Sequence, residues 1–233
     1  MPVHVTRCGS SPSRTSDDLG VVAIRGPMTI SQLTLRLSPM PAASGDLTRS
    51  RLAGVDVFAA RTTAEGPDGI DLYSRRRDME TIVACLEEVA TPLVTAPEWE
   101  LFRLEYGVAR SGIEIEEGDT PVEAALERLV ALDKPTRFPG RNALAERVRT
   151  GAVRRLVGFM ASSDTVPPPG AVVFVNGRMV DRVRSSGRSP RHGAIGMTAV
   201  PLGADQPGTV LTITDGGRTW PAVVARVPFG SET

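Results

Sequence analysis

The sequence predicts an α+β protein, and three observations lead to this class. In the first 150 residues, several segments repeat apolar residues at helical spacing. Between them lie short runs rich in Val, Ile and Leu, which are typical of strands. After Thr150 the pattern changes to short strand-like segments separated by Gly and Pro, which indicates a small β-barrel or sandwich. We therefore predict two domains, residues 1–150 and residues 151–233.

The first domain is predicted to contain both strands and helices. Its strands are Val3–Arg7, Leu19–Arg25, Val55–Arg61 and Ile70–Tyr73. The last two form a hairpin, because a turn rich in Gly and Pro at residues 65–69 joins them. One helix follows the Gly26-Pro27 turn, with Ile30, Leu33 and Leu37 on one side. A second helix begins after Asp78, and its apolar face contains Met79, Ile82, Val83, Leu86 and Val89.

The segment 119–144 carries the most complete set of helix signals in the chain. Thr120 and Glu123 form a Thr-x-x-Glu capping box, and a proline occupies the first helical position between them. An apolar stripe at helical spacing follows, made of Val122, Ala125, Leu126, Leu129 and Val130. Prolines between residues 135 and 140 end this pattern, and a second, short helix is expected to open at Asn142.

The second domain is predicted to consist of short strands joined by tight turns. The strands are Leu156–Met160, Ala171–Val175, Arg178–Val183, Ala194–Val200, Val210–Thr214 and Pro221–Arg226. Asn176-Gly177 and Asp215-Gly216-Gly217 supply turn residues that suit hairpins.

Composition argues against several classes of partner. Lys plus Arg and Asp plus Glu each number 27, so no net field attracts nucleic acid or an anionic membrane. No apolar run approaches the length of a membrane-spanning helix, and the N-terminus lacks the apolar core of a signal peptide. The two cysteines, Cys8 and Cys85, have no CxxC spacing, which suits a reducing compartment. We expect a cytoplasmic protein that binds neither nucleic acid nor membrane.

The residues alone reveal no catalytic or metal-binding motif. His4 and His192 lack sequence partners for a metal site or a nucleophile dyad. The acidic residues of segment 114–119 are interpreted as solvated loop charges, and the basic run Arg75–Arg77 as solvated surface. The glycine-containing turns lack the Lys-Ser or Lys-Thr spacing of a phosphate-binding loop.

Several motifs nevertheless resemble one family. The TPVEA opening at Thr120 is followed by LDK, an aromatic residue, Gly and AL, and the segment LFRLEYG (Leu101–Gly107) is similar to LRLEAG. In the second domain RRLVG, Asn176-Gly177 and SGRSP occur in the family's order. These motifs resemble the aminomethyltransferase family, which includes the glycine cleavage T-protein and the folate domains of dimethylglycine and sarcosine dehydrogenases. Arg137-Phe138-Pro139-Gly140 departs from the family's usual DFIG wording.

The resemblance implies a fold, a cofactor and a missing part. Residues 1–150 correspond to the remainder of a ferredoxin-like α+β folate-binding domain, and residues 151–233 to the family's small C-terminal β-barrel. Family members hold tetrahydrofolate in a central hole and use an early aspartate in one-carbon transfer. The first matching segment here corresponds to a part of the family beyond that aspartate, so we expect no catalytic residue in this chain.

The resemblance also selects Asp71, Trp99 and Arg103 as cofactor-binding residues. Asp71 stands where the family has a glutamate that bonds the pterin, Trp99 replaces an arginine, and Arg103 keeps the arginine of LRLE. Ala64 and Val108 occupy positions of folate-lining tyrosines. A folate site built from these residues is therefore expected to be degenerate.

Three hypotheses follow for function. In the first, the chain is one subunit of a split tetrahydrofolate-dependent one-carbon transferase or demethylase, and a partner chain supplies the missing N-terminal segment. In the second, it is a non-catalytic scaffold or regulatory paralogue. In the third, it is a binding protein with a remodelled folate pocket. The missing segment would leave exposed apolar surface, so we expect a protein partner or a second copy of the chain.

Overall fold

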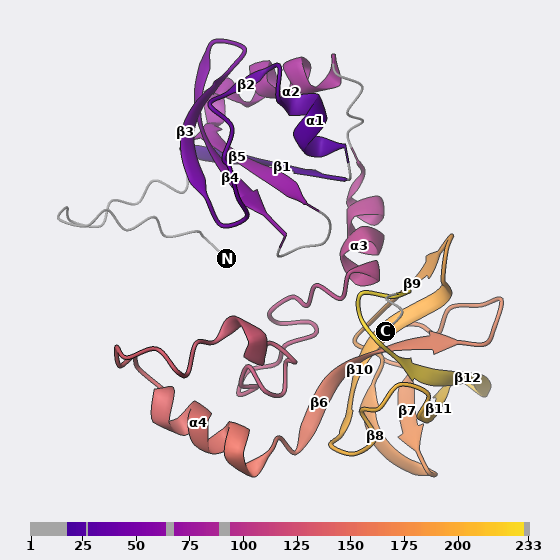
Figure 1. The fold of residues 1–233 in the computed structure, drawn as a ribbon. Coiled ribbons are helices and arrows are strands. Elements are labelled where there is room, and N and C mark those ends of the chain that lie inside the picture. The colour runs from indigo at the N-terminus through magenta and orange to yellow at the C-terminus, as the bar shows by residue number, and fades with distance from the viewer. Residues whose placement is uncertain (1–17, 27, 64–67, 89–93, 231–233) are drawn as a thin grey trace. The chain divides into compact units, whose positions relative to one another are not determined.

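The computed structural model describes residues 18–26, 28–63, 68–88 and 94–230. It confirms the α+β class and divides the chain into two compact units, residues 1–94 and 95–233 (Figure 1). The predicted boundary after Thr150 marks the change from helical to strand-rich sequence, and this change lies inside the second unit. The predicted strand Val3–Arg7 falls outside the described residues. Within the described ranges, no helix is both long and apolar enough to cross a lipid bilayer.

The first unit is an antiparallel sheet with the strand order β1-β5-β4-β3-β2. Its strands are β1 (Leu19–Arg25), β2 (Leu37–Ser38), β3 (Leu47–Leu52), β4 (Val55–Thr62) and β5 (Gly69–Arg75). Its helices are α1 (Thr29–Leu33) and α2 (Met79–Glu87), and a single 3₁₀ turn, η1 (Arg76–Asp78), precedes α2. The strand at residues 19–25 and the hairpin of β4 with β5 are confirmed, whereas β2 and β3 were not predicted.

Both helices of this unit contribute to a core on one face of the sheet. Leu33 of α1 and Ile82 of α2 are buried with the inward-facing strand residues Leu52, Ile70 and Leu72. Burial of this face agrees with the period-2 pattern of β4, in which Val57 and Ala59 are buried while Phe58 is 49% exposed. Within the described part of the chain, the helices cover this face, and the opposite, open face exposes Val21, Leu47 and Phe58.

The second unit contains a curled antiparallel sheet with the strand order β8-β7-β11-β12-β6-β10-β9. Its strands are β6 (Arg154–Ala161), β7 (Val172–Val175), β8 (Arg178–Arg182), β9 (Ser185–Ser189), β10 (Gly193–Pro201), β11 (Val210–Asp215) and β12 (Arg218–Ala225). Because β8 and β9 lie at opposite ends of this order but follow one another in the chain, the sheet must curl. The Arg184 N–H donates to the Met197 carbonyl at 2.9 Å where the two ends meet.

The curled sheet encloses an apolar core, as expected for a barrel. Phe159, Val173, Leu211 and Ile213 are fully buried within it. Gly196 of β10 is closely packed, because a Cβ at this position would collide with the Phe159 ring and lie 2.6 Å from the Ser185 carbonyl oxygen. All six strands predicted in this part are confirmed, and β9 was missed.

The helix predicted from Thr120 is wrong beyond its first turn. The Thr120 N–H donates to the Glu123 carboxylate, which is one half of a capping box, whereas the Thr120 hydroxyl accepts the Val122 N–H at 3.2 Å and donates to the same carboxylate. Ala125 then adopts φ 59°, and the Leu126 N–H donates to the Pro121 carbonyl at 2.7 Å, which closes the turn as a Schellman motif. Only a 3₁₀ turn, η2 (Glu127–Leu129), follows, and Leu129 is 61% exposed.

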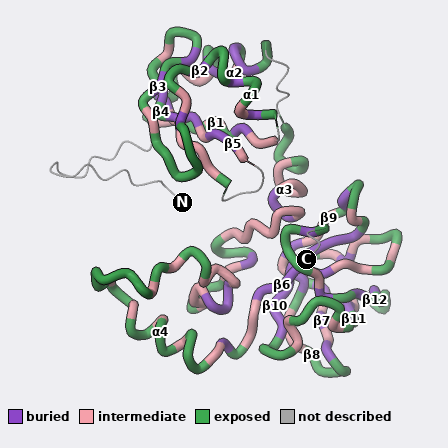
Figure 2. Tube along the Cα trace, viewed as in Figure 1, coloured by how far each residue is buried: buried purple, intermediate pink, exposed green. Residues whose placement is uncertain are grey.

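Two longer helices flank this region in the chain. The first is α3 (Ala96–Glu105), and the second is α4 (Arg141–Thr150), which begins one residue before the predicted start at Asn142. No residue of α4 is buried, as Figure 2 shows by its exposed and intermediate colours. In contrast, α3 packs on β9, because a Cβ at Gly187 would lie 3.1 Å from the Leu101 side chain.

We predict that Gly196→Ala destabilises the second unit by about 1–3 kcal/mol, because the added methyl group meets backbone and a fully buried ring. Urea denaturation followed by fluorescence measures the change. Gly187→Ala is the matched control, since the end of the Leu101 side chain can move aside. An equal effect of the two substitutions would contradict the packing described for β10.

Candidate functional site

The candidate site is built around α3. Thr95 caps this helix: the Glu98 N–H donates to the Thr95 hydroxyl at 3.4 Å, and the Thr95 N–H donates to the Glu98 carboxylate at 2.7 Å. The Thr95 N–H and, at 2.8 Å, the Thr95 hydroxyl both donate to the Glu98 carboxylate, and these two bonds lower the pKa of Glu98 below its ordinary value. The capping box fixes the residue at which α3 begins. This start determines which side chains of the later turns lie on each face of the helix.

A buried ion pair lies at the inner side of α3. Arg103 is 4% exposed and Glu114 is fully buried. The Arg103 Nη2 lies 2.9 Å from Oε1 of Glu114, while its Nε donates to Glu100 at 2.8 Å and its Nη1 to the Val108 carbonyl at 3.0 Å. The second oxygen of Glu114 accepts the Arg110 N–H at 2.8 Å. Two buried charges are thus paired and hydrogen-bonded, which is the condition for tolerating them in the interior.

The same loop is tied to the barrel by further arginines. Arg184 donates from Nη1 to the Glu114 carbonyl at 2.6 Å and from Nε to Asp181 at 2.8 Å. Arg154 of β6 lies 2.9 Å from Oδ1 of Asp119. The interpretation of segment 114–119 as solvated loop charge is therefore wrong for Glu114 and Asp119, whose carboxylates are buried against arginines. It holds for Glu117, which is exposed.

Asp119 shows the electrostatic consequence. Burial alone would raise the pKa of this carboxyl. The hydrogen bond from the Glu116 N–H, at 2.9 Å, and the ion pair with Arg154 outweigh burial and hold the pKa below its ordinary value of 3.8. Asp119 is therefore ionised in the folded protein at neutral pH.

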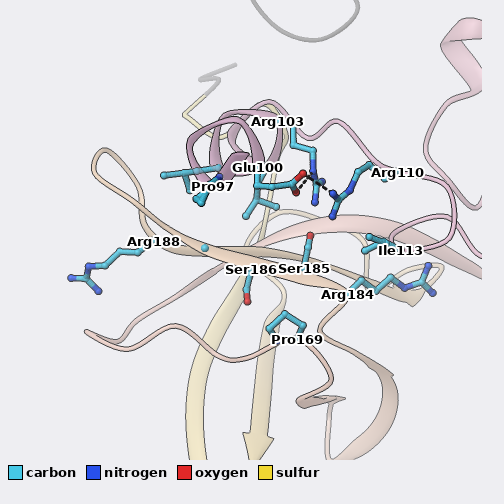
Figure 3. Close-up of a pocket in the computed structure, with 13 residues that line it drawn as sticks. Pro97, Glu100, Arg103, Arg110, Ile113, Pro169, Arg184, Ser185, Ser186 and Arg188 are labelled. Carbon is cyan, nitrogen blue, oxygen red and sulfur yellow. Dashed lines mark hydrogen bonds and ion pairs between the residues drawn. The ribbon is translucent and has the colours of Figure 1, made fainter. Parts of the chain in front are cut away.

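A pocket of about 550 Å³ opens beside α3 (Figure 3). Its lining comes from α3, the loop after it, Pro169 and β9. Leu101, Leu104, Ile113 and the prolines form apolar walls, and Glu100, Arg110 and Ser185 add polar groups. Figure 3 shows Ser185 pointing from β9 toward Glu100 and Arg110, whereas the neighbouring Ser186 points to the opposite side. All these residues belong to the second unit.

The three predicted cofactor-binding residues have different surroundings. Asp71 lies on β5 of the first unit, with one carboxylate oxygen 2.7 Å from Nη1 of Arg25. Trp99 and Arg103 lie one turn apart on α3 of the second unit. The Trp99 ring stacks on Phe102 at 5.3 Å between centroids and does not line the pocket, whereas Arg103 does. Of the three, the structure brings only Trp99 and Arg103 together within one unit, and their cofactor role stays a prediction.

Sequence reasoning missed four residues of this site. Glu114 and Arg110 lie in a loop whose acids were interpreted as solvated, and Arg184 and Ser185 lie around the unpredicted strand β9. The alternation of Ser185, Gly187 and Ser189 gives no apolar signal for a strand. Only pairing with β10 reveals these residues as part of a wall.

Known proteins resemble this chain along most of its length. Residues 154–230 match the family profile described as "Glycine cleavage T-protein C-terminal barrel domain". The aminomethyltransferase of Saccharopolyspora erythraea is 31% identical over 240 residues, which cover 97% of this chain and 64% of that protein. The mitochondrial dimethylglycine dehydrogenase of Homo sapiens is 28% identical over 226 residues, covering 92% of this chain and 26% of that protein.

A solved structure supports the same fold. The crystal structure of the glycine cleavage system aminomethyltransferase T from Bartonella henselae superposes with a TM-score of 0.79 at 24% identity, covering 91% of this chain and 59% of that one. The chain is therefore aminomethyltransferase-like. It spans about three fifths of the length of the aminomethyltransferases it matches.

We predict that Arg103→Met lowers the free energy of unfolding by about 3–5 kcal/mol, because Glu114 would be left charged, buried and without this partner. The double substitution Arg103→Met with Glu114→Leu should recover most of the loss, since both charges are then absent. Urea denaturation gives the values. Arg149→Met is the control, because its ion pair with Glu146 is exposed and should matter little. A double variant as unstable as Arg103→Met would contradict the explanation that the loss comes from an unpaired charge on Glu114.

The lowered pKa of Asp119 predicts a pH dependence. Since the pKa is lower in the folded state, ionisation of Asp119 favours folding. This contribution is complete above roughly pH 4 and is lost as the pH falls through the folded-state pKa. Asp119→Asn should lower stability at neutral pH and flatten its fall in acid, as measured by urea denaturation between pH 7 and 2. Asp215→Asn, at the exposed end of β11, is the control. If the stabilities of wild type and Asp119→Asn fell in parallel as the pH was lowered, the lowered pKa of Asp119 would be refuted.

Proposed function

We propose that this aminomethyltransferase-like chain is one subunit of a split tetrahydrofolate-dependent one-carbon transferase or demethylase. It would transfer a methyl or aminomethyl group together with a partner chain that supplies the catalytic aspartate. The relatives named above support the class of reaction, since one is an aminomethyltransferase and another a dimethylglycine dehydrogenase. The observation that carries the proposal is the open face of the first unit's sheet, which bears Asp71.

The surroundings of Asp71 suit a flat polar ligand. In register across the sheet, Asp71 lies between Ala23 of β1 and Ala60 of β4, which have small side chains, and the Asp71 side chain is 18% exposed. A carboxylate can accept two N–H donors from the edge of a pterin ring. Arg25, 2.7 Å away, keeps one carboxylate oxygen oriented. Asp71 therefore supports folate binding as the shorter counterpart of a family glutamate.

The same face also supports a protein partner. Val21, Phe58 and Leu47 lie on it and are 52%, 49% and 62% exposed. Val21, Tyr73 and Phe58 pair in register and form one apolar row, and Leu47 pairs with Ala60 in the next row. Adjacent exposed apolar side chains of this kind mark interaction surfaces. We infer that the partner chain covers this row and completes the ligand site around Asp71.

Trp99 and Arg103 have different parts in the proposal. Trp99 offers an aromatic face on α3 that can stack on a flat ring. Arg103 uses Nε, Nη1 and Nη2 within the chain, so its contribution is to position Glu100 and the loop after α3. Arg103 acts as a positioning residue in this scheme.

A scaffold or regulatory paralogue remains the alternative. The replaced position Val108 and the shortened acid at Asp71 favour it, because both weaken the family's folate contacts. A remodelled binding protein would share Asp71 and Trp99 with the enzyme but show no one-carbon transfer. The three functions therefore differ in folate affinity and turnover.

We predict that Asp71→Glu strengthens tetrahydrofolate binding and that Asp71→Ala weakens it by about tenfold or more, as expected for a lost charged hydrogen bond. Affinity is measured by equilibrium dialysis of this chain mixed with a partner that carries the rest of the family fold. Asp56→Ala, on the same face but exposed beside Arg49, is the matched control. Equal affinity of wild type and Asp71→Ala for tetrahydrofolate would show that Asp71 does not bind it. That result would favour the scaffold or regulatory function.

A further inference from the structure

The pocket beside α3 has hydrogen-bond donors without acceptors. Among the described residues, the buried Ser185 Oγ, Arg110 Nε and Arg184 Nη2 make no hydrogen bond, and all three residues line the pocket. The two guanidinium nitrogens have carboxylates only at ion-pair distance, Glu114 at 4.0 Å from Arg110 and Glu116 at 3.6 Å from Arg184. Ser185 is 8% exposed, and the Arg184 side chain is 5% exposed. A buried donor that stays unpaired costs stability, so such groups normally have a partner.

The nearby carboxylates do not form these missing hydrogen bonds, since Glu116 and Glu114 stay at 3.6 Å and 4.0 Å from the two guanidinium nitrogens. Both oxygens of Glu100 are used, one by Nε of Arg103 at 2.8 Å and the other by Nη1 of Arg110 at 2.6 Å. Both oxygens of Glu114 accept as well, from Arg103 and from the Arg110 N–H. The pocket is thus left with spare donors, and the group that suits it is an acceptor.

The size and walls of the pocket indicate what carries the acceptor. Its volume of about 550 Å³ far exceeds the roughly 30 Å³ of a water molecule and lies in the range of small-molecule sites. The lining includes the buried Ser185 and Ile113, which is 42% exposed. Leu101 and Leu104 add apolar lining from α3.

We propose that this pocket binds a small organic anion. Its carboxylate or phosphate oxygens accept from Ser185 and Arg110, and its short aliphatic body lies against Leu101 and Ile113. A guanidinium group beside a hydroxyl is a common way to bind either anion. Of the three residues predicted to bind the cofactor, only Arg103 lines this pocket, and its guanidinium nitrogens already donate within the chain.

The test is a titration of the full chain with three probes. Isovalerate carries a carboxylate on a branched aliphatic body, isovaleramide has the same shape without the charge, and inorganic phosphate has the charge without the body. Chemical-shift changes in ¹H–¹⁵N NMR spectra report binding. We expect saturable binding of isovalerate and none of isovaleramide. Saturation by phosphate alone would identify the phosphate group as the preferred form of the anion, and would equally support the site.

Ser185→Ala should weaken binding of the anion by about tenfold, as for a lost hydrogen bond to a charged group. Ser186→Ala is the matched control, since its hydroxyl donates to the Pro167 carbonyl at 2.6 Å and points away from Ser185 (Figure 3). Circular dichroism verifies that both variants fold. Unchanged affinity in Ser185→Ala, or no saturable binding of either anion, would overturn the proposal. Failure of folate to bind the mixed chains would leave it intact.

Discussion

The ion pair of Arg103 with Glu114 is the constraint on which the second unit depends. Glu114 is fully buried, so its charge must be matched, and Arg103 lies 2.9 Å away on α3. The Glu114 carbonyl accepts from Arg184, next to β9, and its carboxylate accepts from the Arg110 N–H. One buried acid thereby joins α3, its following loop and the end of the barrel sheet. The pocket exists because these elements meet around charges that cannot close into an apolar core.

The sequence predicted the barrel strands well because Gly and Asn turns punctuate alternating apolar residues. The prediction from sequence failed where tertiary contacts determine the length of an element. Thr95 and Thr120 both open a Thr-x-x-Glu motif, yet the first starts a helix of 10 residues and the second only one turn. After Thr120, the Glu123 carbonyl accepts the Leu156 N–H of β6 and Glu127 pairs with Arg155, so the segment follows the strand. Local signals specify a helix start but not its length.

The candidate site was predicted only in part, for a related reason. Arg103 was selected through a motif, but its partner Glu114 lies 11 residues later in an acidic loop that resembles solvated charge. Ser185 lies in a polar strand without apolar alternation, and only its pairing with β10 makes it part of a wall. Asp71 differs, since the period-2 pattern of β5 correctly separates it from the buried Ile70 and Leu72. The face on which a strand residue lies can be predicted from sequence. The ion-pair partner of a residue across a loop cannot be predicted in this way.

The functional proposal rests on two surfaces, the open sheet face of the first unit and helix α3 of the second. Neither is proposed to support activity without a partner chain. Asp71 lies on an open sheet face beside exposed apolar residues, and α3 carries Trp99 at a position where the family has an arginine. The most direct measurement is calorimetric titration of tetrahydrofolate into this chain alone and into its mixture with a partner that carries the rest of the fold. We predict saturable heat only in the mixture. No binding in the mixture, or equal binding by this chain alone, would contradict the split transferase.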